Sequence, residues 1–294
     1  MIVSASYRTD IPAFYGRWFM TRLDAGFVRT FNPYGGQKHD VALGRDDVDG
    51  FVFWTRNADP FMAALREIHR RGYPFVVQFT VTGYPKPLER SVIDAGRAIG
   101  QMRAIAAAFG PHAVVWRYDP IVVSDLTPPA WHFGNFAVLA RTLTGSVDEV
   151  VVSFVEVYRK TKRNLDSAAR ASGFAWHCLE PDAKCRLIAS LVELARAHGM
   201  RLSLCTQPTF VVDGAEAARC IDTARLSAVA GYEIVAQTKG NRPGCFCAES
   251  RDIGAYDTCP HGCVYCYAVN SRAATLRNHA AHDPASAFLI ERPG

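Results

Sequence analysis

Short apolar runs rich in β-branched residues recur along the chain and constrain its fold more than any other feature. They lie at residues 2–6, 26–31, 50–55, 75–81, 113–118, 150–155, 201–205 and 232–236. Most are separated by segments with helical periodicity, such as 183–199, where apolar residues recur every three or four positions and a glycine ends the pattern. Repeated strand-helix units favour a parallel sheet, and so many of them in one domain predict an α/β fold of the TIM-like (β/α) barrel type.

A compact group of cysteines late in the sequence indicates the chemistry. Cys259, Cys263 and Cys266 fall within eight residues at the spacing C-x3-C-x2-C. Three thiolates on one loop can hold three irons of a [4Fe-4S] cluster and leave the fourth iron open to a small molecule, as a catalytic metal site requires. The alternative is a structural zinc site with a fourth ligand such as His261, Cys245 or Cys247. Structural zinc sites usually pair two C-x2-C steps and this loop has one, so we favour the cluster.

Four further cysteines can form a second site. A fully ligated second [4Fe-4S] cluster needs four thiolates, and the candidates are Cys205, Cys220, Cys245 and Cys247. The alternatives for this group are a zinc site and buried thiols that serve only packing. The remaining Cys178 and Cys185 have no partner at ligand spacing, so we interpret them as ordinary thiols.

The residues around the three-cysteine loop resemble two known groups of proteins. The string 259–268, with Tyr265 directly before the third cysteine, resembles the cluster loop of radical S-adenosylmethionine (SAM) enzymes and, locally, that of spore photoproduct lyase and its relatives. Residues 2–12 and 242–268 resemble the domain of unknown function 1848 family, nearly end to end. The first resemblance implies an enzyme whose cluster binds SAM and cleaves it reductively to a 5'-deoxyadenosyl radical that acts on an unknown substrate. It also implies an electron donor such as a reductase, a flavodoxin or a ferredoxin.

The position of the loop implies a rearranged barrel. Radical SAM enzymes carry this loop after their first strand, whereas here it lies near the end of the sequence. The resemblance therefore implies a circular permutation. The segment before Cys259 would correspond to the first strand of the radical SAM barrel, residues 271–283 to its first helix and residues 2–6 to its second strand. Such permutations are tolerated because the termini of domains tend to lie close together. We expect residues 1–240 to form the barrel body and residues 241–294 to complete it.

Polar and aromatic residues gather where the predicted strands end, which is where barrel enzymes place their chemistry. They are Arg8, Asp10, Trp54, Thr55, Arg56, Asn57, Gln78, Thr80, Thr82, Arg117, Tyr118, Asp119, Glu156, Tyr158 and Lys160. Each residue alone also fits a hydrogen bond or ion pair at a strand end. As a group they predict an occupied cavity.

The SAM-binding interpretation assigns roles to several of these residues. Arg117 or Arg8 can hold the SAM carboxylate through a planar guanidinium group. Asp119 or Asp10 can accept hydrogen bonds from the ribose hydroxyls or the amino group. The other predicted cofactor contacts are Trp54 and Tyr118, which can stack on adenine or on a substrate ring, together with Arg56, Gln78 and Tyr265.

The catalytic candidates lie after the first and sixth predicted strands, and they are Arg8, Asp10, Tyr158 and Lys160. Residues 7–10 read Tyr-Arg-Thr-Asp where radical SAM enzymes have the Gly-Gly-Glu that contacts the amino group of SAM. Inside the cluster loop, His261 can tune the cluster by a hydrogen bond to sulfur or to SAM.

Other functions and the compartment follow from composition. The likeness to spore photoproduct lyase suggests a DNA or nucleotide repair lyase, and the basic run 158–163 suits nucleic acid or phosphate as well as a solvated helix start. Alternatives from other classes are a non-catalytic iron-sulfur or electron-transfer protein and a zinc-stabilised barrel hydrolase. Nine clustered cysteines suit metal binding in a reducing cytosol. No stretch approaches the roughly 18 apolar residues of a membrane span, so we expect a cytoplasmic protein with no membrane partner.

Overall fold

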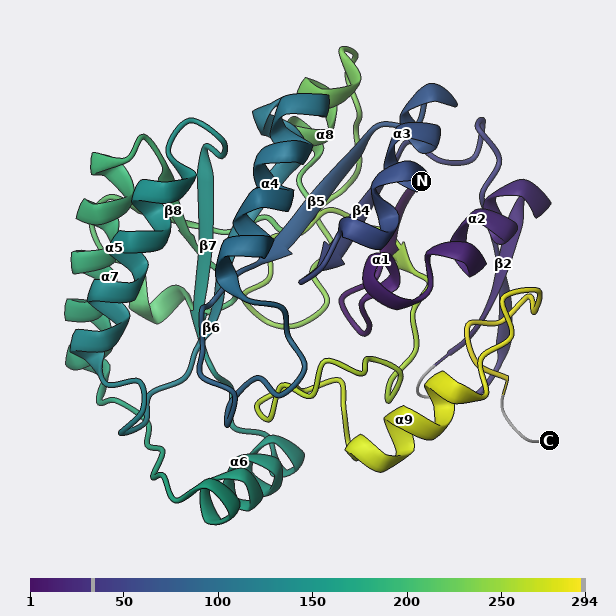
Figure 1. The fold of residues 1–294 in the computed structure, drawn as a ribbon. Coiled ribbons are helices and arrows are strands. Elements are labelled where there is room, and N and C mark those ends of the chain that lie inside the picture. The colour runs from purple at the N-terminus through teal and green to yellow at the C-terminus, as the bar shows by residue number, and fades with distance from the viewer. Residues whose placement is uncertain (33–34, 292–294) are drawn as a thin grey trace.

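The computed structural model describes residues 1–32 and 35–291, and over these residues the chain forms a parallel sheet of eight strands. The strands are β1 (Ile2–Ala5), β4 (Gly50–Thr55), β5 (Phe75–Thr80), β6 (Val114–Ile121), β7 (Glu149–Phe154), β8 (Arg201–Leu204), β9 (Ala215–Ala217) and β10 (Ser250–Asp252). Their order across the sheet is β10-β1-β4-β5-β6-β7-β8-β9 (Figure 1). The last strand of the chain therefore pairs with the first, and the predicted α/β class with a large parallel sheet is confirmed.

Helices connect successive strands, as parallel pairing requires. They are α1 (Ile11–Phe14), α2 (Gly16–Ala25), α3 (Met62–Arg70), α4 (Ala95–Phe109), α5 (Pro129–Leu143), α6 (Arg159–Ser172), α7 (Pro181–Ala197), α8 (Thr223–Ala230) and α9 (Arg272–Ala280), with the 3-10 helices η1 (Asp59–Phe61), η2 (Pro111–Ala113) and η3 (Pro208–Phe210). Helix α4 packs on β6 and α7 packs on β8 (Figure 1). The helix predicted over 183–199 is α7, which starts two residues earlier because proline suits the first helical position.

The two faces of the sheet bury different residues. Successive residues of a strand point to opposite faces, and the side chains of Phe53, Val77 and Trp116 belong to the large core under the helices. On the other face, an apolar layer packs against the segment that contains α8, and it consists of Ile2, Val52, Val76, Val115 and Val151. Two residues further along that face stand Ser4, Trp54, Gln78, Arg117 and Ser153. The face of the sheet opposite the large core thus becomes polar toward the carboxyl ends of the strands.

Two predicted strands are corrected. Residues 26–31 correspond to β2 (Phe27–Phe31), which pairs with β3 (Lys38–Ala42) in a separate antiparallel hairpin. Residues 232–236, which the structure describes in full, form no strand. They follow Gly231, which ends α8 in the left-handed conformation, and Ser227 Oγ accepts a hydrogen bond from the Ile234 amide at 2.8 Å. A side chain therefore satisfies this backbone in place of a strand ladder.

The segment after the cysteine loop returns to the first helices of the chain. The Tyr15 hydroxyl donates to the Thr258 carbonyl at 2.5 Å, and Trp18 Nε1 donates to the Ser286 carbonyl at 3.0 Å. Figure 1 shows α9, in yellow, at this end of the molecule. These contacts hold the C-terminal segment, and with it the cysteine loop, against the N-terminal part of the fold.

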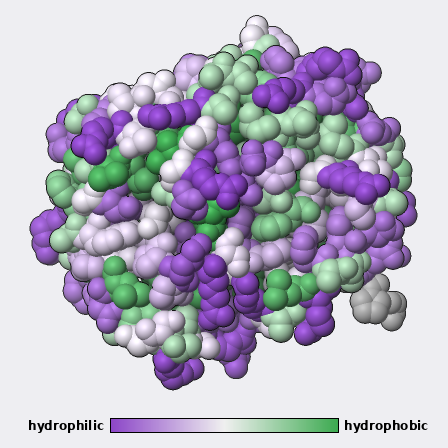
Figure 2. Space-filling view, viewed as in Figure 1, coloured by the Kyte–Doolittle hydropathy of each residue, from purple (hydrophilic) through white to green (hydrophobic). Residues whose placement is uncertain are grey.

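Among residues 1–32 and 35–291, no helix combines the length and the apolar character needed to cross a bilayer. Figure 2 shows hydrophilic and hydrophobic residues interspersed over the viewed face.

Candidate functional site

A cavity of about 1160 Å³ opens at the carboxyl ends of the strands. Its wall includes both predicted groups of thiols: Cys259, Cys263 and Cys266 from the loop after β10, and Cys205, Cys220, Cys245 and Cys247 from the chain after β8. Cys205 follows β8, whereas Cys245 and Cys247 directly precede β10 and the three loop cysteines follow it. The strands between them supply further predicted residues to the wall, among them Arg8, Asp10, Trp54, Arg56, Arg117, Asp119, Tyr158 and Lys160.

Asp252 at the end of β10 binds residues at and after the end of β1 in this wall. Its carboxylate accepts from the hydroxyls of Ser4 and Ser6, each at 2.7 Å, and from Arg8 Nε at 2.9 Å. Both partners of the Arg8–Asp252 ion pair are buried, with side chains 8% and 4% exposed. The Arg8 charge is therefore compensated within the protein, and the pair joins the ends of β1 and β10.

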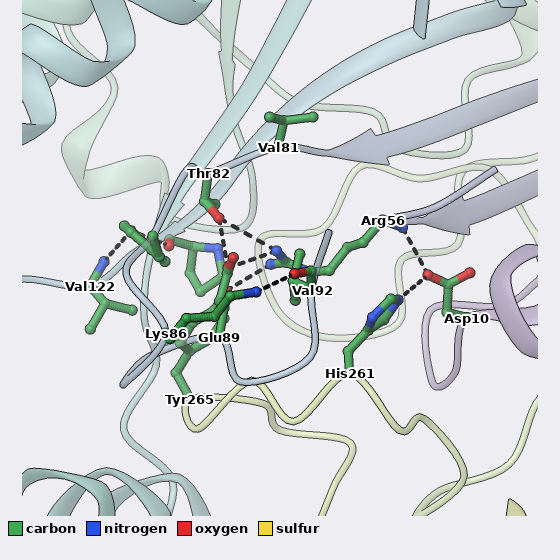
Figure 3. A network of polar contacts seen from close by, with 12 residues as sticks. Asp10, Arg56, Val81, Thr82, Lys86, Glu89, Val92, Val122, His261 and Tyr265 are labelled. Atoms are coloured by element: carbon green, nitrogen blue, oxygen red, sulfur yellow. Dashed lines mark hydrogen bonds and ion pairs between the residues drawn. The ribbon is translucent and has the colours of Figure 1, made fainter. Parts of the chain in front are cut away.

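Asp10 connects the cysteine loop to two strands (Figure 3). Its Oδ2 lies 2.7 Å from His261 Nε2 and accepts from the Arg56 amide at 2.8 Å. Its Oδ1 accepts from the Ala13 amide at 2.9 Å and caps α1. The other ring nitrogen of His261, Nδ1, is buried without a hydrogen-bond partner among the described residues. His261 thus keeps one polar atom available in a residue that lines the cavity.

Glu89 forms the centre of a buried network that the sequence did not reveal (Figure 3). Its Oε1 accepts from Arg56 Nη1 at 2.7 Å and from Thr82 Oγ1 at 2.6 Å, and it also accepts from the Tyr265 hydroxyl. Arg56 Nη2 donates to the same hydroxyl at 2.7 Å. Glu89 and Cys263 form a backbone bridge as well. A lone carboxylate in a proline-containing loop gives no local signal of this role, since only the fold brings the loop to the cysteines.

The three loop thiols are half-buried in the cavity wall, and the loss of solvent around them changes their acidity. Desolvation raises the pKa of Cys259 well above its ordinary value and that of Cys263 to about 12. Burial also raises the pKa of Cys266. Although burial opposes the charged form of Arg56, Cys263 and Glu89 raise the pKa of its guanidinium well above the usual value. These thiols need positive charge nearby to become thiolates, which is what a bound metal supplies.

The second group of thiols is close-packed. Cys205 Sγ and Cys220 Sγ lie 3.7 Å apart, and the Ile221 amide donates to Cys247 Sγ at 3.4 Å. A hydrogen bond from Cys247 lowers the pKa of Cys245 to about 6. The group therefore forms a chain of interacting thiols at one side of the cavity. No group of three or more His, Cys, Asp or Glu side chains within the described ranges is arranged to hold a single metal ion.

Arg117 and Asp119 lie beside the second thiol group in the cavity wall. Arg117 Nη1 donates to Cys220 Sγ at 3.0 Å and to Gln78 Oε1 at 3.1 Å, while Nη2 donates to Asp119. Ser153 donates to the other Asp119 oxygen. Gln78 is buried behind the wall and donates to the Cys220 carbonyl at 2.9 Å. The predicted residues Gln78, Arg117 and Asp119 therefore come together, and Arg117 contacts a thiol directly.

The rim of the cavity holds other predicted residues. The rings of Trp54 and Tyr7 meet edge to face with centroids 6.1 Å apart. Lys160 Nζ lies 5.1 Å from the centre of the Tyr256 ring. Tyr158 is 43% exposed, and Arg242 donates to its hydroxyl at 3.2 Å. These groups are positioned to meet a molecule that enters the cavity.

Tyr118 does not take the predicted stacking position. It is fully buried, and its hydroxyl lies 2.9 Å from His132 Nδ1 in the layer between the sheet and α5. Side chains alternate along a strand, and Arg117 and Asp119 point toward the cavity. Tyr118 must therefore point to the opposite face of the sheet. The prediction that it stacks on a ligand ring is wrong.

Two cations of the basic run 158–163 bind other groups within the fold. Lys162 Nζ pairs with Asp166 at 2.7 Å, and Arg163 Nη2 donates to the Asn270 carbonyl at 2.6 Å. This pattern favours a solvated start of α6 over a nucleic-acid surface.

Comparison with known proteins places the chain in a family. The family model described as a domain of unknown function (DUF1848) matches residues 2–268, a range that holds β1 to β10 and both thiol groups. No curated protein and no solved structure gives a match. Since the match covers most of the chain, the protein belongs to the domain of unknown function 1848 family.

Proposed function

We propose that the protein is a radical SAM enzyme with a SAM-binding [4Fe-4S] cluster on Cys259, Cys263 and Cys266. The observation that carries the proposal is that these three thiols share one cavity with the ends of the central strands. The donor set fits a cluster with one iron left open, because it offers three thiols on one loop. When bound there, the cluster supplies the electron that cleaves SAM and so generates the 5'-deoxyadenosyl radical.

We further propose that the sheet is a circularly permuted radical SAM barrel that begins with β10. The parallel pairing of Ser250 with Ile2 and of Asp252 with Ser4 supports this order. The cysteine loop then follows the first strand of the barrel, although it comes late in the chain. Asp252 supports the same arrangement, because its carboxylate joins the ends of these two strands.

The protein's own groups available to SAM differ from those expected. Arg8 and Arg117 each already bind a carboxylate, so they serve better to shape the cavity than to hold a second anion. Thr9 Oγ1 and His261 Nδ1 are buried without hydrogen-bond partners among the described residues, and both residues line the cavity. We propose that these atoms hydrogen-bond to the polar end of SAM, because buried polar groups in proteins are generally paired.

We propose a second, fully ligated cluster on Cys205, Cys220, Cys245 and Cys247. The contact between Cys205 and Cys220 and the mutual effects of the thiols on their pKa values support a shared ligand. Thr206, next to Cys205, has a φ of 54°, which is strained for a β-branched residue. Such strain is typical of residues held for function.

The size of the cavity favours an enzyme over an electron-transfer protein. A space of about 1160 Å³ exceeds what a small-molecule ligand usually fills, so it has room for a substrate beside SAM. Electron transfer alone needs no such space. A change in the EPR spectrum of the reduced cluster when SAM is added separates the two functions.

Iron analysis and a cleavage assay test the proposal together. Anaerobically reconstituted protein is expected to hold about eight irons per chain, since each cubane cluster has four. Reduction with dithionite is expected to convert SAM to methionine and 5'-deoxyadenosine. Cys263→Ala is expected to hold about four irons and to lose cleavage.

Cys185→Ala is the matched control, because Cys185 lies in α7 and is not part of the cavity wall. This variant is expected to keep the wild-type iron content and cleavage rate. Stoichiometric zinc in the wild type, or undiminished cleavage by Cys263→Ala, would overturn the proposal.

A further inference from the structure

We propose that Arg117 is a positioning residue that raises the reduction potential of the cluster on Cys205, Cys220, Cys245 and Cys247. The inference rests on the proposed function, since it requires that second cluster. It assigns to Arg117 a role toward sulfur in place of the predicted role toward the SAM carboxylate.

The contacts of Arg117 direct its charge at the thiols. Nη1 lies 3.0 Å from Cys220 Sγ, which is hydrogen-bond distance for a sulfur acceptor. The residue is only 5% exposed, so little solvent screens the interaction. Arg117 therefore places a buried positive charge in direct contact with one of the four proposed ligands.

Neighbouring residues prevent the guanidinium group from turning away. Gln78 Oε1 accepts from the same Nη1 at 3.1 Å, and Gln78 Nε2 donates to the Cys220 carbonyl at 2.9 Å. On the other side, Asp119 binds Nη2 and is itself held by Ser153. Gln78 thus fixes the arginine and the cysteine to each other, and the arrangement is built into β5, β6 and β7.

The charges define the direction of the effect. Four thiolates give the site an excess of negative charge, and reduction adds one more electron. A fixed cation at a ligating sulfur stabilises the reduced state more than the oxidised state, so it raises the potential. Asp119 opposes this effect because its carboxylate lies on the same guanidinium group. Removing the Arg117 charge should therefore lower the potential, whereas removing the Asp119 charge should raise it.

The experiment measures the midpoint potential of the second cluster alone. Cys263→Ala serves as the background, because loss of a loop ligand removes the SAM-binding cluster from the titration. In this background, EPR-monitored redox titration is expected to give a lower potential for Arg117→Met. Arg117→Lys is expected to fall between Met and the parent, since it restores the charge without the planar group. Asp119→Asn is expected to raise the potential and remains informative where Arg117→Met does not fold.

Arg196→Met is the matched control for loss of a cation. Arg196 is 63% exposed in its side chain, pairs with Glu193 at 3.1 Å and is not part of the cavity wall, so it should move the potential less than Arg117→Met does. An unchanged or raised potential in Arg117→Met overturns this inference alone. If the Cys263→Ala protein does not hold about four irons, the second cluster is absent and the inference fails. SAM cleavage by the wild type remains the separate test of the enzyme proposal.

Discussion

Arg225 and Arg201 form a matched pair, because both guanidinium groups bind Glu149 Oε2. Arg225 Nη2 lies 2.7 Å from this oxygen and Arg201 Nη2 lies 2.8 Å from it. Their surroundings differ, since the Arg225 side chain is 4% exposed and the Arg201 side chain is 44% exposed. Arg225 also binds Asp148 at 2.8 Å and belongs to α8, in the segment that brings Cys220 and Cys247 to the sheet.

Arg225→Ala is expected to lower the free energy of unfolding by about 3 kcal/mol. Breaking a buried ion pair costs roughly 3–5 kcal/mol, because the remaining carboxylate stays buried with its charge. We take the lower end of this range since Arg201 and Ser203 still bind Glu149 in the variant. Arg201→Ala is expected to cost at most about 1 kcal/mol, because half-exposed pairs are screened by water.

Urea unfolding of the metal-free, reduced proteins measures both values, since bound metal would add stability of its own. With a slope of about 3 kcal/mol per molar urea, Arg225→Ala should lower the midpoint by about 1 M and Arg201→Ala by at most about 0.3 M. Equal shifts for the two variants, or a larger shift for Arg201→Ala, would refute the argument from burial.

Three further predictions address the site and its surroundings. Burial lowers the pKa of His132 to about 4 from 6.5. Between these pH values the unfolded chain therefore binds a proton that the folded chain does not bind. Stability should therefore fall by up to about 3 kcal/mol as pH drops from about 6.5 to 4. Urea midpoints across this range should show a smaller fall in His132→Gln, and equal slopes would contradict the assignment. Glu89→Ala should leave Arg56 without its carboxylate and free the cysteine loop, so reconstituted protein should keep only about four irons, those of the second site. Retention of about eight would show that the network does not support the loop. Tyr118→Phe should leave SAM affinity unchanged in equilibrium binding, whereas Trp54→Ala should weaken it, because only Trp54 faces the cavity. The reverse order would place the adenine elsewhere.

The sequence predicted most of the sheet because its central strands are buried on both faces. Such strands appear as continuous apolar runs, as in Phe75–Thr80. The hairpin strand at Phe27–Phe31 is also rich in aromatic and β-branched residues, but its partner is local, and composition does not distinguish the two cases. Strand β9 contains only Ala215–Ala217 and was missed, since its pairing with β8 depends on tertiary contacts.

The site was predicted where spacing carries information and missed where it does not. Cys259, Cys263 and Cys266 share a short loop, so their convergence follows from local chain geometry. Glu89 lies far from that loop in sequence and becomes its partner only through the fold. The place of Tyr118 at a strand end does not reveal its contacts, because side chains alternate along a strand and this alternation turns Tyr118 toward α5.

The pairing of β10 with β1 also affects the order in which the protein can be assembled during synthesis. Ser4 and Asp252 are 248 residues apart, and every other strand of the sheet lies between them in the chain. The ribosome therefore releases the thiols near β8 before the loop that follows β10 exists. Until β10 emerges, β1 is an uncovered edge that can pair with a strand from another chain. The cysteine loop must then be the last part of the site to form, so a chain interrupted after residue 249 would present the second thiol group and an open sheet edge without the means to hold the first cluster.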